Sequence, residues 1–415
     1  MKTKSLLKSC VLISVLMPAV SPALTPAPTT FPKLLGMQIG AANYDNVSYQ
    51  QQMAQFDVVI LSFPNNWSTP TFTVRAVVQA LKALNPNILV GQYSILDAAH
   101  NNGLDPDISN TLNANNWWLK DESGAQLQKI SDVNNWNINY TAWTQFDANG
   151  NQYPQWYAQR TYNNFFSLVP ELDIWYFDDV TQKPSNLVAD WKQQGASQFN
   201  TDIDVQTAHY NAHAAEWSAA QLLAPNLIQM GSNVDNDLSI PQWNGKLGAA
   251  YLEGIMGLNW SIENSAGWVA MMQRYYNTVN NTVAPHIIGF NVQNDPTNYS
   301  FFRYAYASCL MNNGYFSFTD PTVGYSSIAW FDEYNVKLGT AIDTPPRVDT
   351  LQVVKRHFQN GMVIVNPTTS TVNVPVESGY SHFVGQQDPV TNDGSAVNGS
   401  ITMPAKSGIV LIQNH

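Results

Sequence analysis

Eight apolar, strand-like runs alternate with amphipathic segments along most of the chain, and this alternation strongly limits the possible folds. The apolar residues in these runs are continuous rather than alternating with polar ones, which is typical of buried parallel strands. The runs lie at 34–40, 56–63, 87–95, 173–180, 226–233, 249–254, 286–293 and 314–320. Helices are expected at 45–55, 70–84, 156–168, 202–222, 264–280 and 299–312. The pattern predicts an α/β fold.

Eight strand–helix units over roughly 300 residues favour a (β/α)8 TIM barrel. The main alternative is a doubly wound sheet, but no glycine-rich phosphate loop follows the first strand. We expect the barrel over 34–344, with a long loop at 97–155 that is too long for an idle connection. In such barrels the C-terminal strand ends face the active site. Residues at those ends are therefore candidates for chemistry.

The sequence changes character near residue 345. From there to residue 415, apolar and polar residues alternate around Gly, Asn and Pro turns. This alternation is typical of antiparallel strands that have one buried face. A small C-terminal antiparallel β-sandwich domain is therefore expected over 345–415.

The N-terminus has the pattern of a secretory signal peptide over 1–23: three lysines, an apolar run, and the small-residue sequence Ser-Pro-Ala. A Pro/Thr-rich linker is expected at 24–33. Cleavage would leave Cys309 as the last cysteine, so no internal disulfide could form, and buried packing is the expected role of Cys309. The protein is expected to be secreted or periplasmic.

Composition narrows the possible partners. Charged residues make up only 12% of the chain, while aromatic residues reach 12%, so Asn, Gln, Ser and Thr must supply most of the polar surface. Such a surface suits sugars, whose hydroxyls bind amides and whose apolar faces stack on rings. Removing Lys2, Lys4 and Lys8 with the signal would change the net charge from −11 to −14. This acidic balance disfavours nucleic acid and anionic membranes as partners. We expect a monomer that binds carbohydrate and no cofactor.

Polar groups stand at several predicted strand ends. Asp178 and Asp179 end the fourth run, DIWYFDDV, and Glu253 ends the sixth. Gln293 ends the seventh run and Asp320 the eighth. Glycoside hydrolysis requires two carboxyl groups around the scissile bond, one protonated and one ionised. Any single Asp at such a position can equally be the N-cap of the next helix. The recurrence at separate strand ends is what favours catalysis.

These motifs resemble those of a known family. The segments IWYFDDV, NGNQYPQWYA, YLEG, GYFSFTD, WFDEYNVKLGTAI and MPAKSGIVLI are similar to the secreted (β/α)8 proteins called the hypothetical glycosyl hydrolase 15 group. That group is distantly related to endo-α-1,4-polygalactosaminidase-like hydrolases, and the resemblance covers roughly residues 34 to 412. It implies that Asp178 and Glu253 are the catalytic pair. Those relatives commonly have Asn where this chain has Asp179, which leaves the choice between Asp178 and Asp179 open.

Aromatic residues near the expected barrel mouth are candidates for sugar stacking. We expect contacts with substrate from Tyr93, Trp118, Trp136, Trp156 and Trp260, and from the polar side chains of Asp179, Gln293 and Asp320. For any one tryptophan, packing inside the protein is the commoner role.

A metal site is the weaker alternative. His209, His213 and Glu216 fall on one face of a predicted helix, but a metalloprotease helix would have Glu directly after the first His. No metal is predicted. The leading hypothesis is a secreted glycoside hydrolase that uses two carboxylates, with Asp178 ionised, Glu253 as general acid/base, and retention of configuration by family analogy. The alternatives are a non-catalytic carbohydrate-binding protein on a degenerate TIM barrel and, more remotely, a metal-dependent hydrolase.

Overall fold

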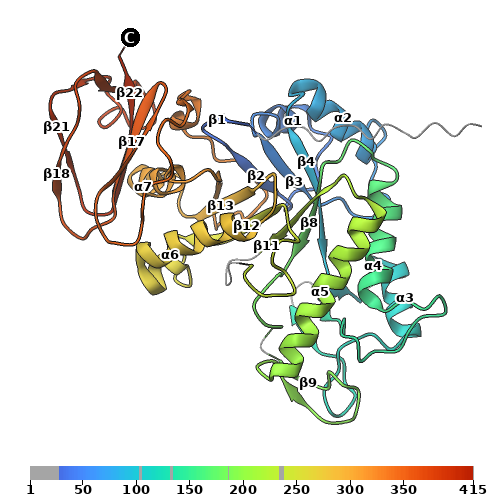
Figure 1. Cartoon of the computed structure of the whole chain (residues 1–415). Coiled ribbons are helices and arrows are strands. Elements are labelled where there is room, and N and C mark those ends of the chain that lie inside the picture. The colour runs from blue at the N-terminus through green and yellow to red at the C-terminus, as the bar shows by residue number, and fades with distance from the viewer. Residues whose placement is uncertain (1–27, 102–104, 131–133, 186, 233–237, 415) are drawn as a thin grey trace, which may run out of the picture.

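The computed structural model describes residues 28–101, 105–130, 134–185, 187–232 and 238–414. Its centre is an eight-stranded parallel sheet whose order along the sheet is β14-β13-β12-β11-β8-β4-β3-β2 (Figure 1). The strands are β2 (Leu35–Gln38), β3 (Val58–Leu61), β4 (Leu89–Ile95), β8 (Ile174–Asp178), β11 (Ile228–Ser232), β12 (Ala249–Met256), β13 (Ile287–Gln293) and β14 (Tyr315–Thr319). A parallel bridge between Leu34 and Phe316 brings the two edges together. The predicted α/β TIM barrel is confirmed, and each of the eight predicted strands forms.

The six predicted helices also form. They are α1 (Val47–Met53), α2 (Val74–Leu84), α4 (Tyr153–Thr161) with its π-helical continuation η1 (Tyr162–Phe166), α5 (Ile203–Leu223), α6 (Ile262–Asn281) and α7 (Tyr299–Leu310). Polar caps begin several of them: Asn46 accepts from the amide of Tyr49, and Asn298 accepts from that of Phe301. Such caps satisfy amides that have no partner within the helix.

The helical layer is less regular than eight equal units would give. In the described part of the connection between β11 and β12, residues 238–248 form turns and no helix. After β14, a short 3-10 helix, η2 (Asp332–Asn335), leads towards the C-terminal strands. The C-terminal region packs against α7: a Cβ added at Gly408 of β22 (Ser407–Gln413) would lie 2.2 Å from the carbonyl oxygen of Arg303.

The barrel interior changes from apolar to polar along the strands. Alternate residues point inwards, so the lower layers contain the apolar cluster of Leu35, Met37, Val58, Ile60, Leu89, Ile174, Tyr176, Ile228, Met230, Ala249, Tyr251, Ile287 and Tyr315. Further along the strands, inward positions become polar. Tyr251 contacts Ser317 at 3.1 Å, and Asn291 donates to Thr319 at 3.0 Å. The C-terminal end of the barrel interior is therefore lined by polar side chains.

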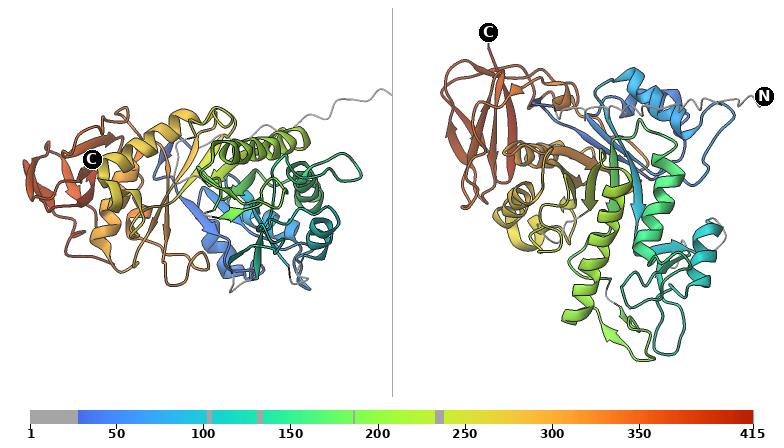
Figure 2. Two further views of the ribbon diagram at one scale, coloured as in Figure 1. Left: turned by 90° about the horizontal axis from the view of Figure 1, so that it is seen from below. Right: turned by 45° about the vertical axis from the view of Figure 1, so that its right-hand side comes forward.

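Residues 97–155, predicted as a loop, contain their own structure and are called the insertion below. They include β5 (Ala98–His100), α3 (Pro106–Ala114), β6 (Gln128–Ile130) and β7 (Asn135–Asn137), with β5-β7-β6 as a small sheet. A hairpin of β9 (Val188–Ala189) and β10 (Gln198–Phe199) lies at the same end of the molecule (Figure 2). A second core, built around Trp117, Trp118, Tyr140, Tyr153 and Trp191, joins these pieces. Each element is too short to show clear periodicity, which is why the sequence did not indicate them.

The C-terminal region forms two antiparallel sheets. One has the order β16-β17-β22-β19-β20 and the other pairs β18 with β21. The bounds are β16 (Val354–Phe358), β17 (Gly361–Asn366), β18 (Val372–Pro375), β19 (Tyr380–His382), β20 (Ala396–Val397), β21 (Ser400–Met403) and β22 (Ser407–Gln413). Met362, Val374, Met403 and Leu411 belong to one buried cluster that joins the two sheets. This is the predicted sandwich, although the domain boundaries remain predictions.

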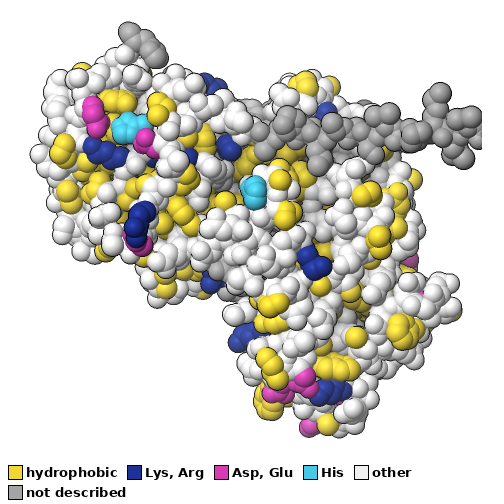
Figure 3. Space-filling model, viewed as in Figure 1, with side chains coloured by type: hydrophobic (Ala, Val, Ile, Leu, Met, Phe, Trp, Pro, Cys, Tyr) yellow, Lys and Arg dark blue, Asp and Glu magenta, His cyan; other side chains and the backbone are white. Residues whose placement is uncertain are grey.

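The predicted linker at 24–33 lies only partly within the described residues. Thr30 and Phe31 form β1, which pairs with β15 (Gly339–Thr340), and Phe31 is only 4% exposed. The predicted signal peptide at 1–23 lies outside the described residues. None of the described helices combines the length and apolar character needed to cross a bilayer. Charged side chains are sparse and scattered on the face seen in Figure 3, as the composition implies.

Candidate active site

Two tyrosines inside the barrel identify the face of β8 and β12 on which the predicted acids lie. Tyr176 of β8 and Tyr251 of β12 meet edge to face, with ring centroids 6.2 Å apart. Asp178 and Glu253 each stand two residues further along the same strands, so they share the inward face. Since β11 alone separates β8 from β12, the two strand axes lie about 10 Å apart. The sheet thus brings Asp178 and Glu253, called the carboxylate pair below, to one side of the barrel mouth.

Asp178 ends β8 and is held by a tyrosine from the neighbouring strand. The Tyr93 hydroxyl of β4 donates to Oδ2 of Asp178 at 2.6 Å. The Tyr93 ring stacks on that of Tyr176, with centroids 5.8 Å apart. Burial raises the pKa of Asp178 to about 8, and the negative charges of Asp179 and Glu253 raise it in the same direction. Tyr93 opposes this rise because its hydroxyl stabilises the ionised carboxylate.

Glu253 lies on an irregularity of β12. The pairing of β12 with β13 shifts register between Leu252 and Met256, and Gly254 has a φ of 53°. Bulges of this kind turn a side chain towards a new direction and are frequent beside active sites. The amide of Gly254 donates to Asn291 at 2.8 Å, which fixes the irregular backbone.

Tyr325, in the segment after β14, donates its hydroxyl to Oε1 of Glu253. Gln293 donates to the same tyrosine oxygen at 3.2 Å, so the predicted Gln293 is connected to Glu253 through Tyr325. Burial raises the pKa of Glu253, and Asp179 adds to this effect. Both members of the carboxylate pair therefore bind protons more readily than an ordinary carboxyl group.

Asp179 points to a different partner from Asp178. Its backbone has a φ of 53°, a left-handed conformation that residues other than glycine seldom adopt. Its carboxylate pairs with Lys129 of β6, whose Nζ also lies 2.7 Å from both carboxylate oxygens of Asp97. Asp179 is thus a member of an ion-pair network that ties the insertion to the barrel mouth.

Trp260 is the predicted tryptophan that the structure brings near the pair. Its side chain is 55% exposed, and its ring lies against Gly254. A Cβ at Gly254 would lie 2.3 Å from the edge of that ring, so glycine is needed beside Glu253 both for its φ and for this contact. The exposed ring next to Glu253 could stack on a sugar.

Among the described residues, the other predicted binding residues have hydrogen-bond and ring partners other than the carboxylate pair. Asp320 accepts from the amide and hydroxyl of Thr322 at 2.9 and 2.7 Å, so it stabilises a turn. Trp118 is 2% exposed and donates to Asn113 within the insertion. Trp136 donates to Asn134, and Trp156 packs against Trp117 and Tyr153 in the core of the insertion. Packing therefore accounts for the buried Trp118, whereas Trp136 and Trp156 are half-buried and their predicted role in sugar binding stays a prediction.

The candidate metal ligands His209, His213 and Glu216 lie on α5, where they are buried. His209 uses both ring nitrogens, contacting the Tyr140 hydroxyl at 2.9 Å and the carbonyl of Thr181 at 2.8 Å. Burial lowers the pKa of His209 to about 4, so it is neutral at physiological pH. Within the described ranges, no cluster of three or more His, Cys, Asp or Glu side chains is arranged to hold a metal ion.

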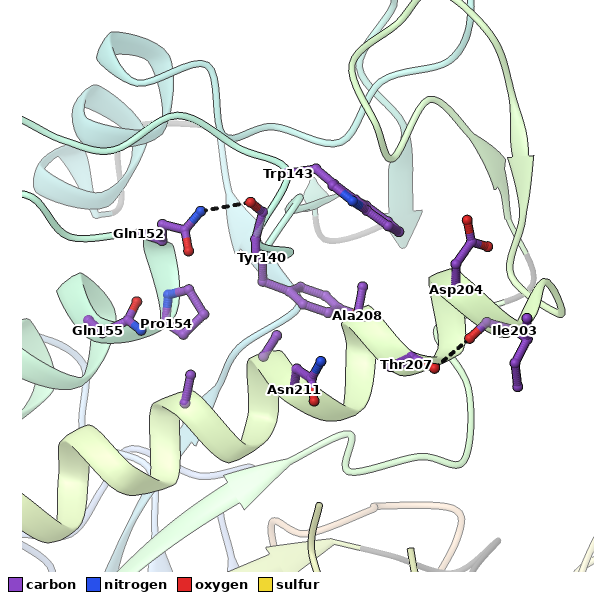
Figure 4. Close-up of a pocket in the computed structure, with 13 residues that line it drawn as sticks. Tyr140, Trp143, Gln152, Pro154, Gln155, Ile203, Asp204, Thr207, Ala208 and Asn211 are labelled. Atoms are coloured by element: carbon purple, nitrogen blue, oxygen red, sulfur yellow. Dashed lines mark hydrogen bonds between the residues drawn. The ribbon is translucent and has the colours of Figure 1, made fainter. Parts of the chain in front are cut away.

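A groove of about 600 Å³ lies between the insertion and α5 (Figure 4). Tyr140 and Trp143 stand on one side of it, and Ala208 and Asn211 of α5 on the other. Its lining contains neither Asp178 nor Glu253. The candidate site is therefore identified by the carboxylate geometry and not by groove size.

Three residues of the site were not predicted from the sequence: Asp97, Lys129 and Tyr325. Asp97 follows β4 almost directly, so the reasoning applied to the other strand ends could have found it. Lys129 was harder to identify. Several acids close together require a cation to offset their charge, and the chain has only 19 Lys and Arg residues from which to choose one. Tyr325 had no signal, because its position depends on how the segment after β14 folds back.

Comparison with known proteins supports the fold. No known family profile matches the sequence, and no curated protein matches it. The structure is similar to Amy13B of Eubacterium rectale, with 9% identity, a TM-score of 0.51, and coverage of 94% of this chain and 97% of that one. At this identity, the likeness shows a shared fold.

Two further solved structures resemble the chain at lower scores. An Anoxybacillus α-amylase is 9% identical, with a TM-score of 0.48 and coverage of 92% of this chain and 98% of that one. The glycoside hydrolase domain of PelA from Pseudomonas aeruginosa is 12% identical, with a TM-score of 0.44 and coverage of 72% and 99%.

Proposed function

We propose that the protein is a glycoside hydrolase in which Asp178 and Glu253 flank the scissile bond. The observation that carries this proposal is their shared position: two carboxyl groups on the inward face of β8 and β12, at the C-terminal end of the barrel. Catalytic residues of TIM-barrel enzymes stand at such strand ends. The resemblance of IWYFDDV and YLEG to the hypothetical glycosyl hydrolase 15 group assigns the same two positions.

The protonation of the pair also supports this chemistry. Burial raises the pKa of both carboxyl groups, and the charge of Glu253 raises the pKa of Asp178 further, which disfavours two charges at neutral pH. A pair that shares one proton supplies the acid and the ionised carboxylate that glycoside cleavage needs. We assign Asp178 as the ionised group during the reaction and Glu253 as the general acid/base. Trp260 would stack on the sugar, and Gln293 would orient Glu253 through Tyr325.

The substrate is proposed to be a polysaccharide or oligosaccharide outside the cell, with retention of configuration. The test is to incubate the purified protein with a panel of microbial and host polysaccharides and to measure reducing ends and released fragments. Nuclear magnetic resonance of the first product gives the anomeric configuration. Saturable binding with no cleavage across the panel would instead indicate a carbohydrate-binding protein. Cleavage abolished by EDTA and restored by a metal would indicate a metal-dependent hydrolase.

A further inference from the structure

Lys129 belongs to the insertion and lies at the barrel mouth. It lies on β6, which pairs with β7, and β7 pairs with β5, the strand that follows Asp97. Its side chain is only 16% exposed. Its ammonium group contacts both oxygens of Asp97 at 2.7 Å and one oxygen of Asp179. One cation from the insertion therefore bridges two carboxylates that follow β4 and β8.

The charges around the mouth are unbalanced. Asp97, Asp178, Asp179 and Glu253 are four carboxyl groups, and among the described residues Lys129 is the cation that pairs with members of this group. The other titratable groups that interact with them are Tyr93 from β4, Tyr176 from β8, Tyr251 from β12, Tyr325 from the segment after β14, Tyr140 from the insertion, Tyr153 from α4, and His209 and Glu216 from α5. The tyrosines are uncharged at neutral pH. Without a cation, each carboxylate would oppose ionisation of the others.

We propose that Lys129 is a positioning residue that neutralises Asp179 and thereby allows its neighbour Asp178 to ionise. This inference rests on the proposed function of Asp178. The left-handed backbone of Asp179 separates the two neighbouring side chains, so that Asp178 contacts Tyr93 while Asp179 contacts Lys129. Lys129 thus acts on Asp178 through Asp179, without being part of the contact between Tyr93 and Asp178.

The direction of the electrostatic effect follows from the geometry. Asp179 is the nearest acidic neighbour of Asp178 in the chain, and its charge raises the pKa of Asp178. We therefore expect that removing the cation that offsets this charge raises the pKa of Asp178 further. An opposite charge within hydrogen-bond distance of a carboxyl group changes a pKa by about one to three units. Because Lys129 acts through Asp179, we expect the lower end of this range.

The decisive measurement is the pKa of Asp178 itself, obtained without substrate. Aspartate labelled with carbon-13 at the side-chain carboxyl is titrated by nuclear magnetic resonance, and the Asp178 signal is assigned by its loss in Asp178→Asn. We expect Lys129→Met to raise the pKa of Asp178 by about one unit. Lys129→Arg should restore most of the wild-type value. Adding Asp179→Asn to Lys129→Met should reverse most of the rise.

Lys120→Met is the matched control, because Lys120 also belongs to the insertion but its side chain pairs with Asn116. It should leave the Asp178 titration unchanged. Near-ultraviolet circular dichroism establishes that each variant is folded. An unchanged Asp178 pKa in folded Lys129→Met would overturn the inference, as would equal shifts in the Lys120 and Lys129 variants. If the wild-type protein cleaves no polysaccharide, the proposed function fails separately, while this titration still tests the role of Lys129.

Discussion

The hydroxyl of Tyr93 lies 2.6 Å from Oδ2 of Asp178, and the two residues come from adjacent strands of the barrel. A hydrogen bond to a charged group is worth about 1.5–3 kcal/mol, and here it favours the ionised form of Asp178 against burial. The contact forms because the pairing of β4 with β8 brings the two side chains together, and it acts on the carboxyl group that we propose to be catalytic.

Tyr93→Phe should therefore lower kcat/KM by about ten- to a hundredfold while leaving the protein folded. The measurement is steady-state hydrolysis of the polysaccharide identified in the panel. Tyr276→Phe is the matched control, because its hydroxyl contacts the carbonyls of Met311 and Pro346 far from the carboxylate pair. Equal losses in both variants would mean that the effect is structural.

The pH dependence follows from the raised pKa of Asp178. If Asp178 must be ionised and Glu253 protonated in the free enzyme, kcat/KM should be bell-shaped in pH, with its rising limb set by Asp178, whose pKa burial and neighbouring acids raise to about 8, and its falling limb set by Glu253. The measurement is kcat/KM between pH 5 and 9. A profile whose falling limb, instead of its rising limb, is set by Asp178 would assign the essential proton to Asp178 and exchange its role with Glu253.

Trp260→Ala should weaken substrate binding and leave the fold intact, because its ring is 55% exposed beside Glu253. We expect KM to rise about tenfold, which corresponds to about 1.4 kcal/mol. Phe146→Ala removes an aromatic ring that is 64% exposed on the insertion and is the control. If KM responds equally to both changes, Trp260 has no special role at the mouth.

Glu216 should make stability depend on pH. It is buried, and its carboxylate has no hydrogen-bond partner among the described residues. Burial raises its pKa well above the ordinary value of 4.5, so the folded protein keeps a proton that the unfolded chain loses above pH 4.5. The free energy of unfolding should therefore fall with pH, by up to about 1.4 kcal/mol per unit from this group.

Glu216→Gln removes this contribution, so the variant should gain stability relative to wild type as the pH rises from 5 to 8. Urea unfolding at several pH values measures the difference. Glu122→Gln, an exposed change in the insertion, is the control and should show no such trend. A constant difference for Glu216→Gln across this range would contradict the raised pKa.

The sequence was sufficient to predict the strands of the barrel and the two acids at their ends, because each depends on one simple physical rule. Continuous apolar runs predicted the eight strands, because parallel strands are buried on both faces. Alternation then places Asp178 and Glu253 at equivalent inward positions above Tyr176 and Tyr251. The strands follow from the local pattern of apolar residues. The positions of Asp178 and Glu253 follow because the active site of a TIM barrel lies at the C-terminal ends of its strands.

Side chains whose position depends on tertiary packing were harder to predict. Trp118 was expected to bind sugar, but the second core of the insertion buries it. Lys129 was not predicted, because nothing near it in the chain shows that β6 reaches back to Asp97 and Asp179. The exposed position of Trp260 depends on Gly254, whose φ of 53° belongs to an irregularity that the sequence does not mark.

The most direct test of the account is to compare the wild-type protein with Asp178→Asn and Glu253→Gln on the polysaccharide that it cleaves. Both substitutions keep the size of the side chain and remove the ionisable group. The account predicts that each lowers kcat by at least about a thousandfold, equivalent to about 4 kcal/mol, with unchanged circular dichroism and retained polysaccharide binding. Wild-type turnover in either folded variant would contradict it.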